Sequence, residues 1–138
     1  MNVIVDCMLK SNDEGVVIND YIKNDPLSEN NLDKTLDLAN EFRLSKPEKS
    51  IWLYTGYEWE NIMDYEAAET DGFDYIEETY IDGIYENRKK IISQCDVLVD
   101  GQYIDLQRNI TLPFRGSSNQ RIINVKESLK EGEIVLWK

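Results

Sequence analysis

The sequence predicts an α/β fold, because amphipathic helical segments alternate with short apolar runs that are typical of buried strands. Residues 28–44 carry apolar side chains at helical spacing, with cap candidates before them and a proline after them. The runs 51–54 and 97–99 are apolar, and each is closed by a polar residue and a glycine. A helix predicted at 84–94 separates them, and a strand-helix-strand order implies a parallel pair.

Each element rests on its own pattern. The helix at 28–44 has one apolar stripe, formed by Leu32, Leu36, Ala39 and Phe42. In the helix at 84–94, the isoleucines Ile84, Ile91 and Ile92 form a partial apolar face, and the basic side chains Arg88, Lys89 and Lys90 are predicted to be exposed. Two short elements are expected at 121–125 and 133–137, separated by a lysine-rich stretch with helical potential. Near the N-terminus, 3–5 and 16–18 are candidate strands, although 6–10 could equally continue a helix.

The composition sets bounds on the class of protein. A chain of 138 residues with 41% hydrophobic content fits a single domain over 1–138 with a real core. The sequence has no apolar stretch of membrane-spanning length and no secretory signal, so a cytoplasmic protein is expected. The only cysteines, Cys7 and Cys95, are far apart, and there is no histidine. We therefore predict no disulfide framework, no metal site and no catalytic triad.

The negative charge is concentrated in one segment. Residues 58–87 hold 11 of the 27 acids and no lysine or arginine, while the rest of the chain is nearly neutral. Direct binding of nucleic acid is not expected, because phosphate contacts need basic side chains. This acidic insertion is either a solvated segment or an arm that docks on a basic protein surface. The residues predicted to contact such a partner are Asp74, Tyr75, Glu77, Glu78, Tyr80 and Asp82.

Three motifs in order carry a family resemblance: IWLYTGY at 51–57, CDVLVDG at 95–101 and RGSSNQRII at 115–123. Together with VKESL at 125–129, they resemble the C-terminal part of the anaerobic ribonucleoside-triphosphate reductase activating proteins, a radical S-adenosylmethionine family. The resemblance covers 25–138, beginning with DPL at 25–27, and leaves a divergent segment at 1–24. The architecture it implies is a partial or remodelled barrel-like parallel sheet with flanking helices.

Two features of that family are missing. Its four-iron cluster is held by a Cys-x-x-x-Cys-x-x-Cys loop, which has no counterpart in this sequence. Lys23 and Asn24 stand where the family has paired glycines that approach S-adenosylmethionine. We therefore expect no cofactor, neither the cluster nor S-adenosylmethionine, and no radical chemistry.

The retained motifs define the candidate site residues. By resemblance, Thr55 and Gly56 would line a vestigial cofactor pocket and Asp100 would lie near the ribose, with Gln102 replacing a frequent basic residue. The alternative is that these are turn residues that end strands at the carboxyl edge of the sheet. The loop at 115–121 offers a guanidinium, two hydroxyls and an amide, a set that suits a carboxylate, a phosphate or the backbone of a partner. The alternative is a loop between strands that caps itself. The loop residues predicted to bind are Arg115, Ser117, Ser118 and Asn119.

Two classes of function remain open at this stage. The first is a degenerate activating-protein relative that binds a protein partner, such as the anaerobic ribonucleotide reductase, without generating radicals. The second is an acidic inhibitor or decoy of a basic nucleic-acid-binding protein, of the phage counter-defence or anti-CRISPR type. A fragment of a genuine activating enzyme is a further alternative.

Overall fold

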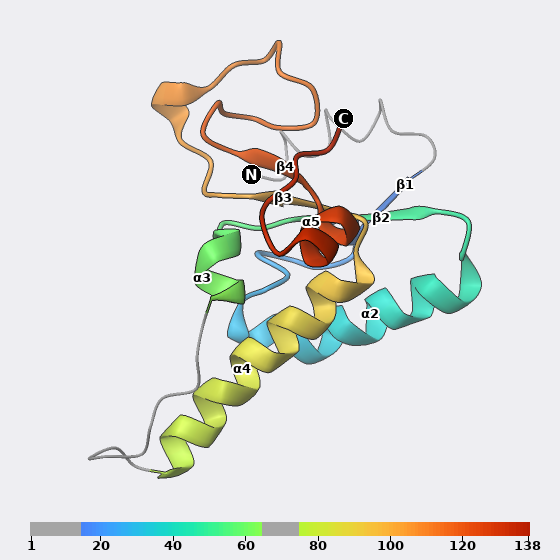
Figure 1. Cartoon of the computed structure of the whole chain (residues 1–138), viewed down its shortest axis with the longest axis vertical. Helices are drawn as coiled ribbons and strands as arrows, with labels where there is room; N and C mark the ends of the chain where they lie inside the picture. The colour runs from blue at the N-terminus through green and yellow to red at the C-terminus, as the bar shows by residue number, and fades with distance from the viewer. Residues whose placement is uncertain (1–14, 65–74) are drawn as a thin grey trace.

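The computed structural model describes residues 15–64 and 75–138, and Figure 1 shows them as a sheet with helices on one side and a long loop on the other. The strands are β1 (Gly15–Val17), β2 (Ser50–Tyr54), β3 (Val97–Asp100) and β4 (Arg121–Asn124). The α-helices are α2 (Leu32–Ser45), α3 (Trp59–Met63), α4 (Tyr75–Gln94) and α5 (Val125–Glu131). Short 3-10 turns are η1 (Ile18–Asp20), η2 (Glu29–Asn31) and η3 (Asp105–Gln107). Within these ranges, no helix has the length and apolar character that a bilayer crossing requires.

The strands lie in sequence order, β1-β2-β3-β4. β1, β2 and β3 are parallel, with Trp52 opposite Val97, so the predicted parallel pairing of 51–54 with 97–99 is confirmed. β4 runs antiparallel to β3, and the prediction of a parallel sheet is wrong for this strand. The reason is that 101–120 returns the chain to the end of the sheet that it left, without a crossover helix. The described strands form an open sheet, and barrel-like closure is not confirmed.

The face of the sheet toward the helices holds the larger core. Ile51 and Leu53 of β2, Leu98 of β3 and Ile123 of β4 are fully buried there. They alternate with residues on the other face, as the period of two along a strand requires. α2 and α4 cover this side (Figure 1).

The opposite face holds a second apolar cluster, built around Trp52 and Val99. No described helix covers this side. Instead, Phe114 from the loop after β3 packs on Trp52 with ring centroids 5.1 Å apart, and Trp137 approaches Trp52 at 5.8 Å. Aromatic rings therefore close the side of the sheet that faces away from the helices.

The two long helices confirm their predictions in most respects. In α2 the buried side chains are Leu32, Thr35, Ala39 and Phe42, while Leu36 is partly buried. α4 begins well before residue 84, and Ile91 and Ile92 are fully buried as predicted. Arg88 was predicted to be exposed, and this prediction is wrong. Its Nε donates to the Leu27 carbonyl at 2.8 Å, and its guanidinium lies 4.2 Å from the centre of the Tyr57 ring.

The acidic segment 58–87 is not confirmed as a separate insertion, since its described parts belong to α3 and α4. Trp59, an aromatic residue within it, is buried in the core and does not project toward a partner. Asp74 and the predicted elements 3–5 and 6–10 lie outside the described residues. The strand predicted at 16–18 is present as β1.

The C-terminal elements follow β4 without a break. Asn124 caps α5 by accepting from the Glu127 N–H at 3.1 Å, and α5 ends at Gly132, whose φ of 73° favours glycine. The element expected at 133–137 is reduced to one antiparallel bridge, between Ile123 and Leu136. The lysine-rich stretch is helical, as expected.

Asp96 joins three elements at the amino end of β2 and β3. Its carboxylate accepts from the Ile51 N–H at 2.8 Å and from Arg43 Nη2 at 2.7 Å, and it lies 3.2 Å from Lys126 Nζ. Burial acts to raise the pKa of Asp96, but the hydrogen bonds from Ile51, Arg43 and Lys126 outweigh it and hold the pKa below its usual range.

Asp96→Asn is expected to lower the free energy of unfolding by about 1–3 kcal/mol at pH 7, because hydrogen bonds to a charged acceptor are lost. The folded pKa is depressed, so this stabilisation is present above the unfolded pKa of about 4 and disappears as the pH falls through the folded pKa. Urea denaturation of both proteins at pH 7, 4 and 3 measures the difference. A gap that stays constant across this range would contradict the role of the ionised carboxylate.

Candidate functional site

The predicted cofactor residues do converge at one edge of the sheet. Thr55 and Gly56 follow β2, Asp100 ends β3, and the Thr55 N–H donates to the Val99 carbonyl at 3.0 Å. Parallel neighbouring strands bring their carboxyl ends together, and ligands of open α/β sheets bind at this position. We call this region the carboxyl edge.

The polar groups of Thr55 and Gly56 are already bonded within the chain. The carboxylate of Asp25 accepts from Thr55 Oγ1 at 2.8 Å, from the Gly56 N–H at 2.8 Å and from the Leu27 N–H at 3.0 Å. Thr55 is fully buried. Asp25 therefore occupies the donors that the carboxyl edge would otherwise present to a ligand.

Close packing around Gly56 reinforces this arrangement. A Cβ at Gly56 would lie 3.2 Å from Gln102 Cγ and 3.5 Å from Asp25 Oδ2, so side chains already fill the space above this glycine. Asn24, just before Asp25, adopts a φ of 69°. Asparagine tolerates this left-handed conformation, which is otherwise typical of glycine.

Asp100 is an enclosed acid, with its side chain 1% exposed. It accepts from the Trp59 N–H at 2.8 Å, at the start of α3, and from Arg121 Nε at 3.0 Å. Arg121 also binds Glu60, with Nη1 to Oε2 at 3.1 Å. Asp100 therefore links β3, β4 and α3.

Arg121 shifts in pKa because of its two acidic partners, Asp100 and Glu60, and it shifts the pKa of Glu60 in return. Hydrogen bonds to Asp100 and then to Glu60 raise the pKa of Arg121 above its ordinary value. The hydrogen bonds from Arg121 in turn lower the pKa of Glu60. Arg121 and Glu60 are thus ionised at neutral pH, and the guanidinium of Arg121 bridges the side chains of Glu60 and Asp100.

The loop at 115–120 caps itself around the buried side chain of Gln120. Gln120 Oε1 accepts from the Gly116 N–H at 2.9 Å, and its Nε2 donates to the Gly101 carbonyl at 3.1 Å. Arg115 Nη1 donates to the Gln120 carbonyl at 2.7 Å, while Arg115 Nε is buried without a hydrogen-bond partner. Ser117 is fully buried. The hydrogen bonds of Gln120 and Arg115 correspond to the alternative of a loop that caps itself.

The other predicted loop residues lie nearer the surface. Asn119 Nδ2 donates to the Gln102 carbonyl at 2.8 Å, and exposed Ser118 donates from its hydroxyl to Gln107 Oε1 at 3.2 Å. Both side chains therefore stabilise the loop that joins β3 to β4.

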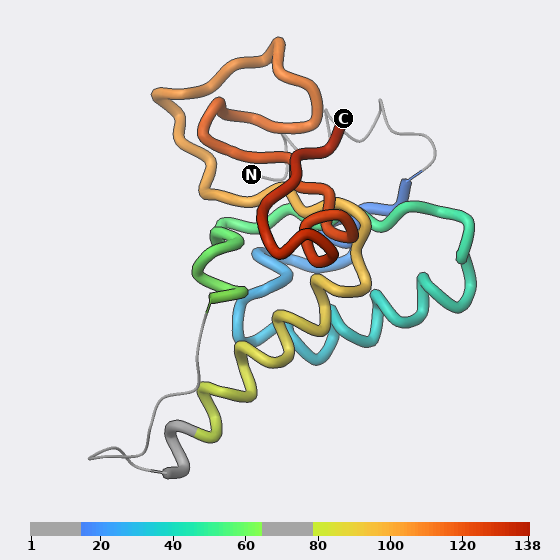
Figure 2. Tube along the Cα trace, viewed as in Figure 1, coloured from blue at the N-terminus to red at the C-terminus, as the bar shows by residue number. Residues whose placement is uncertain are grey.

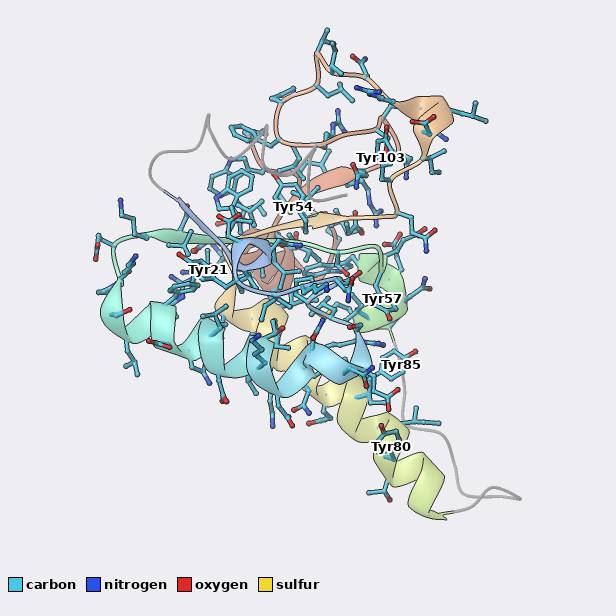
Figure 3. The ribbon with its side chains drawn as sticks, turned by 180° about the vertical axis from the view of Figure 1, so that it is seen from behind. Tyr21, Tyr54, Tyr57, Tyr80, Tyr85 and Tyr103 are labelled. Carbon is cyan, nitrogen blue, oxygen red and sulfur yellow. The ribbon has the colours of Figure 1, made fainter. Side chains whose placement is uncertain are left out.

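The predicted contacts on α4 do not meet the carboxyl edge. Tyr80 is 59% exposed and projects from the part of α4 that extends beyond the sheet (Figure 3). Asp82 lies on the same helix, as do Tyr75, Glu77 and Glu78, of whose side chains the structure gives no description. Tyr85 and Tyr57 flank Arg88, with the guanidinium 5.2 Å and 4.2 Å from their ring centres (Figure 3).

The cysteines do not fit a four-iron cluster, which needs closely spaced thiolates. Cys95 is fully buried, and burial raises its pKa to about 12, so it is a neutral thiol at pH 7. Its Sγ lies 3.4 Å from the Ile91 carbonyl oxygen. The other cysteine, Cys7, lies outside the described residues. Among the residues that are described, no three side chains converge as metal ligands.

Sequence reasoning missed three residues that organise this region: Asp25 as the occupant of the carboxyl edge, Arg121 as the partner of Asp100, and Gln120 as the centre of the loop. All three fall within quoted motifs, but no pairing was assigned to any of them. A signal was available for Arg121, because a buried acid such as Asp100 needs a basic partner and the chain has only 15 bases.

Comparison with known proteins gives consistent matches. A family model described as "4Fe-4S single cluster domain" matches residues 3–123. The chain is similar to the anaerobic ribonucleoside-triphosphate reductase-activating protein of Vibrio cholerae, at 33% identity over 71% of this chain and 49% of that protein. It is similar to the proteins of the same name in Haemophilus influenzae, at 28% identity over 74% and 52%, and in Enterobacteria phage T4, at 29% over 71% and 47%. The chain spans about half the length of these curated relatives, and no solved structure gives a significant match.

Proposed function

The chain belongs to the 4Fe-4S single cluster domain family and is a relative of the anaerobic ribonucleoside-triphosphate reductase-activating proteins. We propose that it acts by binding a protein partner and not by generating a radical. The partner proposed is the enzyme named in those relatives, the anaerobic ribonucleoside-triphosphate reductase.

The observation that carries this proposal is the state of the carboxyl edge. Asp25 bonds both Thr55 and Gly56, and Gln102 packs over Gly56. A nucleoside cofactor at this edge would have to displace a carboxylate from three donors. We therefore propose that S-adenosylmethionine is not bound there.

Asp100 supports the same conclusion. In the family resemblance it would lie near a ribose, yet both of its oxygens accept hydrogen bonds from Arg121. A carboxylate enclosed in this way has little capacity left to bind a hydroxyl of a ligand. Its role in this chain is to hold α3 and β4 to β3.

Binding to the reductase can be tested directly. Purified chain and the anaerobic reductase of the organism that encodes it should form a complex by isothermal titration calorimetry under anaerobic conditions. Addition of S-adenosylmethionine should leave the affinity unchanged. Failure to detect a complex at protein concentrations of about 100 μM would contradict the proposed function.

The absence of radical chemistry has its own test. Anaerobic reconstitution with iron and sulfide is expected to leave the protein colourless, because two cysteines cannot supply three clustered thiolates. Iron analysis and the visible absorption spectrum measure this. The control is the Cys7→Ser/Cys95→Ser double variant, which should retain the same background of iron. A stoichiometric four-iron chromophore that the control loses would show that the chain does hold a cluster.

The acidic decoy is a second candidate, favoured by the acids and the exposed Tyr80 on α4. Such binding to a basic protein would weaken steeply as salt screens the charges, over a Debye length of about 10 Å at 0.1 M. The salt dependence of any complex therefore separates this candidate from a mainly apolar contact.

A further inference from the structure

The loop between β3 and β4 carries two of the three most exposed large apolar side chains in the described part of the chain. We call residues 101–120 the lobe. Figure 2 shows it on the opposite side of the sheet from α2 and α4. Leu106 is 98% exposed and Ile110 is 82% exposed, and both lie on the lobe. Single exposed apolar residues are common on protein surfaces, so exposure alone does not make Leu106 and Ile110 a binding surface.

Hydrogen bonds fix the backbone between Leu106 and Ile110. The Ser118 N–H donates to the Gln107 carbonyl at 2.9 Å, and the Asn109 N–H donates to the Gly116 carbonyl at 3.1 Å. An antiparallel bridge joins Arg108 to Ser117. The outgoing and returning halves of the lobe are thus tied together across its width.

The base and the tip of the lobe are equally constrained. At the base, Phe114 packs on Trp52. At the tip, Asn109 Oδ1 accepts from the Thr111 N–H at 3.0 Å, and η3 places Leu106 on a short helical turn. The lobe is therefore preorganised, so that binding through it would sacrifice little conformational entropy.

The charge of the lobe differs from that of the rest of the molecule. The lobe holds one acid, Asp105, and two bases, Arg108 and Arg115, for a net charge of +1. Since the whole chain carries −12, the remainder carries −13. The centre of a protein interface typically has few charged residues around its apolar anchors, and the lobe has this composition.

We propose that the lobe is the docking surface for the reductase, with Leu106 and Ile110 inserted into an apolar socket on that enzyme. This inference rests on the proposed function and names the surface that performs it. The lobe connects the motifs at 95–101 and 115–123, two of those in which the chain resembles the activating proteins. A binding function can therefore persist where the cofactor edge is filled.

Other occupants fit the lobe less well. Nucleic acids and anionic membranes would be repelled by the −13 charge of the remaining chain. A second copy of the chain would bring another −12, and that repulsion opposes self-association. An apolar socket on a protein makes use of both exposed side chains and requires no counter-charge.

The test compares two matched variants by calorimetric titration with the purified anaerobic reductase. The lobe variant is Leu106→Ser/Ile110→Ser, and the control is Leu44→Ser on α2, where Leu44 is 86% exposed on the other side of the sheet. All three side chains are exposed, so melting temperatures should match the wild type. The lobe variant is expected to bind roughly 30-fold more weakly or worse, as loss of central anchors does, and the control to bind as the wild type.

Salt distinguishes the lobe from the acidic helix. The loss in the lobe variant should be similar at 0.05 M and 0.5 M salt, because an apolar contact is not screened. Equal binding of the lobe variant and the wild type would overturn the lobe as docking surface while leaving the proposed function intact. If the wild type itself does not bind, the proposed function fails, and this inference fails with it.

Discussion

Arg121→Met is expected to destabilise the protein by about 3–5 kcal/mol, the range seen when one partner of a buried ion pair is removed. Asp100 would keep the hydrogen bond from the Trp59 N–H and lose those from Arg121, although its side chain is only 1% exposed. A charge enclosed in this way has no access to water that could replace the guanidinium. Methionine preserves the apolar stem of the arginine, so the measured loss of stability comes from removal of the guanidinium group.

Chemical denaturation of Arg121→Met and Glu60→Gln separates the stability that Arg121 gains from Asp100 from the stability that it gains from Glu60. The side chain of Glu60 is 48% exposed, and losing an exposed pair changes stability by about 0–1 kcal/mol. The double variant Asp100→Asn/Arg121→Met should recover part of the loss, because the buried charge is removed as well. Equal effects of Arg121→Met and Glu60→Gln would show that Asp100 is not the important partner.

Asp25→Ala is expected to cost about 2–4 kcal/mol, because it leaves Thr55 Oγ1 and the Gly56 N–H without their acceptor at a closely packed edge. Within residues 15–64 and 75–138, no other side chain bonds both groups. Asp25→Asn keeps one acceptor oxygen and should show a smaller loss.

The matched control for Asp25→Ala is Asp37→Ala, an exposed acid on α2 that removes the same charge. Urea denaturation of the three variants gives the comparison. If Asp25→Ala and Asp37→Ala have the same effect, the carboxylate of Asp25 contributes only its charge, and the carboxyl edge is not held closed by it.

The regular elements could be predicted well because their signals are local. The stripe from Leu32 to Phe42 predicts α2, and the apolar runs predict β2 and β3. The direction of β4 could not be predicted in this way. It depends on how the lobe returns the chain, and the lobe is ordered by side-chain bonds, such as those of Gln120, that have no periodic pattern.

The site was predicted only in outline, for a related reason. Thr55, Gly56 and Asp100 were identified as strand ends at one edge, and the structure brings them together. Their partners are remote in sequence: Asp25 lies 30 residues before Thr55, and Arg121 lies 21 residues after Asp100. The prediction that Arg88 is exposed failed similarly, because the carbonyl it binds belongs to Leu27, 61 residues away.

The lobe leaves and rejoins the sheet at Asp100 and Arg121, which are paired neighbours on β3 and β4. Because its two ends are already side by side, its length can change without moving the register of either strand, and doubling a flexible loop costs only about 0.6 kcal/mol of closure entropy. The lobe is thus a graftable module. Residues 101–120 carry their own internal hydrogen bonds, so replacing them with a loop of another sequence is expected to leave the pairing of β3 with β4 intact.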